Sequence, residues 1–117
     1  MYDFRPPADA SKAELYRELL AAADALTAGE SDGVANMANV AALLWDMLPD
    51  VNWTGFYRMV SSDKQDELVL GPFAGRPACI RIPLGKGVCG TAADRRETIV
   101  VDDVHAARSP VPRGSHR

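Results

Sequence analysis

Residues Pro77–Ala92 read PACIRIPLGKGVCGTA, and this stretch is the most informative part of the chain for its fold. Its first half, Ala78–Leu84, has the composition of a strand, with Pro83 near its end. Its second half opens a glycine-rich loop and a short helix over Gly85–Arg96. The glycines allow a tight turn and a close approach of the backbone where this helix starts.

The same loop fits the dinucleotide-binding pattern G-x-G-x-x-G from Gly85 to Gly90, with Asp102 and Asp103 near the expected acidic position. A parallel crossover, however, needs about a dozen residues or more. Only Thr91–Glu97 separates the last glycine from the next predicted strand. We therefore reject a dinucleotide site.

Two helices are predicted upstream of this stretch. The first begins at Ser11, where Ser-Lys-Ala-Glu fits a capping box, and stops at Gly29. The second opens at Ser31 or Asp32, carries apolar residues at three- and four-residue steps, and ends at Pro49.

Strands are predicted over Val51–Val60 and Glu67–Leu70, joined by a polar turn as a hairpin, then over Ala78–Leu84 and Thr98–Val101. Two helices followed by a hairpin and further strands indicate an α+β fold with an antiparallel sheet. Four short strands and two helices are few elements for a fold of this kind. One edge of the sheet is therefore expected to be open.

Composition limits the functional classes. With 117 residues the chain is expected to form one domain, and its net charge of −3 provides no basic surface for nucleic acid. The longest uncharged run, Gly33–Trp45, is too short to cross a bilayer. The N-terminus lacks the pattern of a signal peptide, so a cytoplasmic location is the expectation.

The two cysteines are the chemical candidates. Cys79 stands at the head of a strand, and Cys89 at the start of a short helix. The helix dipole, together with Lys86, Arg95 and Arg96, favours the reactive thiolate of Cys89. Spacing alone fits two buried structural thiols better.

Other features are less specific. Cys79, Cys89 and His105 offer three zinc ligands, but no C-x-x-C pair accompanies them, and we expect no metal site. Trp53 and Tyr57 share one face of their strand by alternation. Taken alone, they fit packing in the core at least as well as a binding pocket.

Three segments, NWTGFY (Asn52–Tyr57), GPFAG (Gly71–Gly75) and the Pro77–Ala92 stretch, precede DVHA at residues 103–106. In this order the chain resembles the free methionine-(R)-sulfoxide reductases of GAF-domain type from about Leu15 to His105. The resemblance implies a GAF fold, in which a six-stranded antiparallel sheet carries N-terminal helices on one side and the ligand pocket on the other. It divides the chain into an extension (1–10), a GAF-like domain incomplete at its C-terminus (11–105) and a divergent, disordered tail (106–117).

The resemblance also implies roles for individual residues. Cys79 looks like the resolving cysteine, Cys89 like an auxiliary thiol, and Trp53 and Tyr57 like the aromatic part of the substrate pocket. The reacting cysteine expected shortly after His105 is absent.

The activity implied is reduction of free methionine-(R)-sulfoxide to methionine by thiol chemistry, with thioredoxin as the reductant and neither a metal nor an organic cofactor. Without the reacting cysteine, we expect the chain to be inactive as written. The alternative is a GAF-type module that senses a small molecule without turning it over. A homodimer is left open, and natural truncation and a frameshift both fit the divergent tail.

Overall fold

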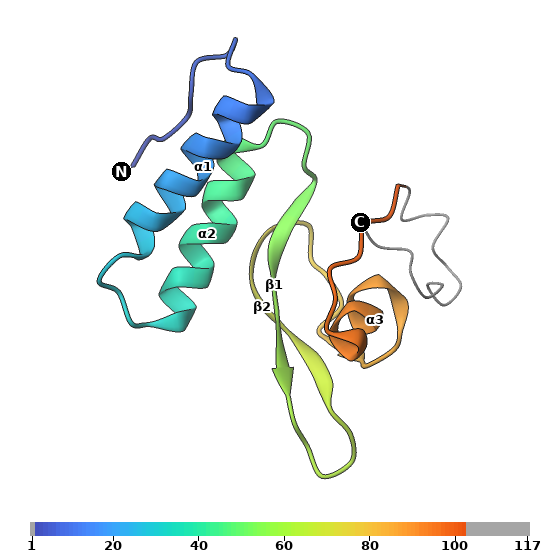
Figure 1. The fold of residues 1–117 in the computed structure, drawn as a ribbon. Coiled ribbons are helices and arrows are strands. Elements are labelled where there is room, and N and C mark those ends of the chain that lie inside the picture. Colours follow the sequence, from blue (N-terminus) through green and yellow to red (C-terminus); the bar gives the residue numbers. More distant parts are fainter. Residues whose placement is uncertain (1, 103–117) are drawn as a thin grey trace. The chain divides into compact units, whose positions relative to one another are not determined.

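The computed structural model describes residues 2–102 and contains three helices and three strands in that range. In chain order these are α1 (Lys12–Thr27), α2 (Gly33–Met47), β1 (Trp53–Val60), β2 (Glu67–Gly75), β3 (Arg81–Pro83) and α3 (Gly87–Arg95). The strands form one sheet in the order β1-β2-β3. The predicted α+β class is confirmed, and β1 and β2 form the predicted hairpin (Figure 1).

The described chain divides into two compact units. The first contains residues 2–56 and 71–77, and the second contains residues 57–70 and 78–102. The boundary cuts through β1 and β2, so each of these strands contributes to both units.

The helices of the first unit start where the capping signals predict. The hydroxyl of Ser11 accepts a hydrogen bond from the amide of Glu14 (3.2 Å), and the carboxylate of Asp32 accepts one from the amide of Ala35 (2.9 Å). Each cap satisfies a backbone donor that the first helical turn leaves unpaired. Gly29 takes a positive φ of 76° in the turn after α1, which is the stop that the sequence predicts.

The core of the first unit lies between α1 and α2, which pack side by side as a helical hairpin (Figure 1). Ala22, Leu43 and Met47 are its buried centre, and Phe4 packs against them from the N-terminal segment. α2 is also tied to β1, because the buried hydroxyl of Thr54 donates a hydrogen bond to the carbonyl of Ala41 (2.8 Å). This bond joins a helix to the sheet inside the first unit.

In the second unit, β3 pairs antiparallel with β2, with Leu68 opposite Ile82. Arg81, which lies opposite Val69, forms an ion pair diagonally across this ladder with Glu67 (2.6 Å). None of the helices within residues 2–102 has the length and apolar character needed to span a bilayer.

Three strand predictions need correction. β2 continues to Gly75 instead of ending at Leu70, and β3 is confined to Arg81–Pro83 within the predicted Ala78–Leu84. Residues 98–101 are not a strand, so the sheet of the described region has three strands and not four. A strand forms where a partner backbone is available, and local sequence does not report the partner.

Candidate functional site

Three of the predicted site residues gather in the second unit. The phenolic oxygen of Tyr57, on β1, donates a hydrogen bond to the main-chain carbonyl of Cys79 at 2.8 Å. Cys79 precedes β3, and Cys89 lies in the first turn of α3. Charges on the two sulfurs influence the ionisation of Tyr57, so the phenol and both thiols form one electrostatic cluster.

Both cysteines are free thiols with exposed surface, unlike the buried structural thiols that their spacing alone favours. Neither is bridged to the other. Exposure of a thiol is one of the two conditions for reactivity, the other being the fraction of thiolate.

The ionisation of Cys89 runs against the expectation from sequence. Its pKa is raised, first because burial of the thiol disfavours the thiolate and second because the neighbouring Cys79 adds negative charge. Although the residue keeps exposed surface, its sulfur is partly withdrawn from solvent, which disfavours the charged form. The prediction that the helix start favours the Cys89 thiolate is therefore wrong.

The pKa of Tyr57 is raised as well, for the same kinds of reason. Burial raises the pKa of its phenol, and the charges of Cys79 and Cys89 raise it further. The phenol is consequently protonated near neutral pH and remains a hydrogen-bond donor there.

Glycines position Cys89 relative to β3. Gly85 and Gly87 have positive φ values of 83° and 63°, and the amide of Gly85 donates to the carbonyl of Gly90 (2.9 Å). At Gly90 a Cβ atom would lie 2.6 Å from the carbonyl oxygen of Pro83, so α3 approaches β3 at backbone distance. The expected role of these glycines, a tight turn and a close approach, is confirmed.

The remaining predicted site residue, Trp53, lies in the first unit. Its ring stacks on Phe73 from β2, with centroids 5.5 Å apart and planes inclined by 15°. Gly55 and Gly75 approach it so closely that a Cβ at either position would collide with the indole. Phe73 belongs to the GPFAG segment but was not singled out in the sequence, and only the motif itself could have indicated it.

Trp53 also borders an open cavity of about 890 Å³ in the first unit. Trp45, Asn52 and Arg76 line the same cavity, which therefore offers aromatic, amide and cationic groups. The cavity is open to solvent, and its lining mixes polar and apolar groups.

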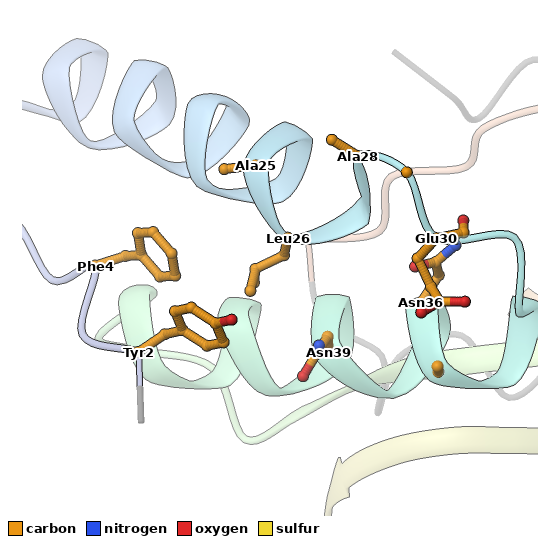
Figure 2. Close-up of a pocket in the computed structure, with 10 residues that line it drawn as sticks. Tyr2, Phe4, Ala25, Leu26, Ala28, Glu30, Asn36 and Asn39 are labelled. Carbon is orange, nitrogen blue, oxygen red and sulfur yellow. Dashed lines mark hydrogen bonds between the residues drawn. The ribbon is translucent and has the colours of Figure 1, made fainter.

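A second cavity of about 380 Å³ lies between the N-terminal segment and the helical hairpin (Figure 2). Tyr2 and Phe4 stack along one side, and the side chain of Asn36 donates a hydrogen bond to the carbonyl of Glu30 (2.9 Å). No cysteine lines this cavity. It has no group suited to thiol chemistry.

Metal ligation has no geometric basis within residues 2–102. No group of three or more His, Cys, Asp or Glu side chains is arranged there to hold an ion. His105, the third zinc ligand considered from sequence, and Asp103 lie outside the described residues, as do the DVHA segment and the tail.

Comparison with known proteins connects this geometry to a family. No family model matches the chain. The chain is 48% identical over 95 residues to the free methionine-R-sulfoxide reductase of Escherichia coli. The match covers 81% of this chain and 55% of that protein. The chain is 40% identical over 99 residues to the free methionine-R-sulfoxide reductase of Saccharomyces cerevisiae, covering 81% of this chain and 54% of that one.

Solved structures similar to this chain include members of the same family. The free methionine-R-sulfoxide reductase of Neisseria meningitidis in complex with its substrate is 43% identical with a TM-score of 0.78, and the match covers 100% of this chain and 64% of that one. A GAF sensor protein from Burkholderia vietnamiensis is 52% identical with a TM-score of 0.76, covering 91% of this chain and 65% of that one. The chain thus spans little more than half the length of the curated relatives it matches.

Proposed function

Over about four fifths of its length the chain is homologous to the GAF-type free methionine-R-sulfoxide reductases, and on that premise we propose that it carries their substrate-binding and resolving-thiol region. The ligand is free methionine-(R)-sulfoxide. The observation that supports this most is the cluster of Tyr57, Cys79 and Cys89, which places a phenolic donor beside two accessible thiols.

In the proposed reaction a thiol attacks the sulfur of the sulfoxide, methionine leaves, and the protein sulfur becomes a sulfenic acid that holds the oxygen. A second thiol condenses with the sulfenic acid to a disulfide and releases water. A dithiol reductant such as thioredoxin then returns both sulfurs to thiols by exchange, and is itself oxidised.

Within this scheme Cys79 is the resolving thiol and Cys89 the auxiliary one. Trp53 and Tyr57 contribute aromatic surface to the substrate. The 117 residues contain two cysteines, and both are assigned to these supporting roles, which leaves no cysteine for the attack on the sulfoxide. We therefore propose that the chain binds the sulfoxide without turning it over by itself. The cytoplasm, where thioredoxin keeps thiols reduced, is the proposed location.

Binding tests the proposal directly. In isothermal titration calorimetry the chain should bind free methionine-(R)-sulfoxide more tightly than the S epimer or methionine. In a thioredoxin-coupled assay with NADPH, sulfoxide-dependent NADPH consumption should not exceed that of a sample without the chain. Equal affinity for both epimers would contradict the assigned ligand, and sustained turnover would contradict the assigned roles of the two cysteines.

A second candidate function is a sensor module that binds a small molecule without redox chemistry. The 52% identity to a GAF sensor protein favours it, as does the raised pKa of Cys89, which makes this thiol a weaker nucleophile near neutral pH. The epimer preference in the binding experiment discriminates the two. A sensor for another small molecule shows no preference for methionine-(R)-sulfoxide over its S epimer or methionine, whereas the reductase-type pocket prefers the R epimer.

A further inference from the structure

The hydrogen bond between Tyr57 and Cys79 has a main-chain acceptor. The phenol of Tyr57 on β1 donates to the carbonyl oxygen of Cys79, which is 22 residues later in the sequence and 2.8 Å away in space. The carbonyl of the next residue, Ile80, accepts from the amide of Leu70 at 2.9 Å. The short segment that carries the Cys79 thiol is therefore held at two successive carbonyls, one by a backbone donor of β2 and one by a side chain.

The side-chain donor can be withdrawn, and the backbone donor cannot. A phenol has a single proton to donate. Tyr57 is only partly buried, so a small molecule can approach its hydroxyl. An acceptor oxygen that receives this hydrogen bond leaves the Cys79 carbonyl without the donor. The two hydrogen bonds exclude each other.

We propose that Tyr57 is a positioning residue that holds the main chain of Cys79 in the empty protein and releases it when its hydroxyl donates its hydrogen bond to an oxygen of the bound ligand instead. This rests on the proposed function, because the ligand oxygen is that of a sulfoxide, which is a strong hydrogen-bond acceptor. Methionine has a thioether sulfur in that place, a weak acceptor, so the reduced compound restores the bond to Cys79. Release of the resolving thiol is thereby coupled to the presence of substrate.

The experiment reads the carbonyl itself. In a triple-resonance spectrum the carbonyl carbon of Cys79 is observed through the amide of Ile80, and that of Cys89 through Gly90 as an internal reference. Tyr57→Phe removes the donor, and Tyr16→Phe, at an exposed position on α1, is the matched control. Each chain is recorded alone, with methionine-(R)-sulfoxide and with methionine.

We expect Tyr57→Phe to move the Cys79 carbonyl resonance upfield, with little change at Cys89 and none in Tyr16→Phe. Adding the sulfoxide to the wild-type chain should move the resonance in the same direction. It should not move it in Tyr57→Phe, and methionine should move it in neither. An unchanged Cys79 resonance in folded Tyr57→Phe would overturn the tether.

The remaining outcomes separate this inference from the proposed function. If the sulfoxide shifts other amides but not the Cys79 carbonyl, the ligand assignment stands and the release is refuted. If it shifts nothing, the proposed function and the release both fail, and the tether is judged by the variant alone. Should Tyr57→Phe not fold, wild-type chain containing 3-fluorotyrosine serves instead. Its more acidic phenol must move the Cys79 resonance downfield, and no movement refutes the tether.

Discussion

Gly90→Ala tests whether the approach of α3 to β3 holds the thiol cluster in place. The added Cβ would lie 2.6 Å from the carbonyl oxygen of Pro83, 3.3 Å from a side-chain methyl of Ile82 and 3.4 Å from the amide nitrogen of Gly85. Unstrained contacts of this kind are about 3.5 Å, so helix and strand must separate by roughly 1 Å. Two of the three atoms belong to the backbone, which cannot rotate away.

The expected loss follows from this overlap. Forcing a methyl group into a packed site costs about 1–3 kcal/mol of unfolding free energy. Gly33→Ala is the matched control, because nothing lies within 4 Å of its new Cβ and its φ is not positive. That control should be neutral or up to about 1 kcal/mol more stable, since alanine restricts the unfolded chain more than glycine does.

The assay is urea unfolding followed by circular dichroism, with native-state alkylation of Cys89 as a local probe of α3. In Gly90→Ala the transition should move to lower urea and Cys89 should become more accessible before global unfolding. An unfolding free energy within about 0.5 kcal/mol of that of the Gly33→Ala control would refute the close-approach argument, because both variants gain from alanine and only Gly90→Ala carries the overpacking cost.

Two further predictions concern single groups. Thr54→Val removes the buried hydrogen bond to the Ala41 carbonyl and should lower the unfolding free energy measured in urea by about 1 kcal/mol. Thr27→Val is the control and should cost less, because the Thr27 hydroxyl bonds within one helix and is less buried. Because the pKa of Cys89 is raised, its thiolate fraction increases at higher pH than that of an unperturbed cysteine. Its alkylation rate, measured peptide by peptide with mass spectrometry, should still be rising at pH values where a model thiol has reached its plateau; an inflection below that of the model thiol would contradict the burial.

How far the sequence predicts this molecule depends on how local each feature is. The caps at Ser11 and Asp32 and the turn at Gly29 are set by contacts within a few residues, and the structure confirms them. The extension of β2 to Gly75 passes through glycines and a proline, which argue against a strand locally. Pairing within the sheet outweighs that local preference.

The site divides in the same way. Tyr57, Cys79 and Cys89 could be selected because their segments carry recognisable motifs. The hydrogen bond from the Tyr57 phenol to the Cys79 carbonyl joins residues that are 22 apart in the sequence, and no pattern of residue spacing predicts it. The direction of the Cys89 pKa shift was predicted wrongly because a sequence shows the helix start and the basic residues but not the loss of solvent around the sulfur.

The end of α3 shows that this sequence is not optimised for stability. Arg96 caps the helix with φ 56° and ψ 46°, the left-handed conformation, and it is the one residue other than glycine with positive φ in residues 2–102. Most helices that end this way use glycine there, because a Cβ atom is strained in that conformation. The arginine therefore leaves a reserve of stability that one substitution could recover. Such a reserve would let a designer introduce destabilising changes near the thiols and still obtain folded protein.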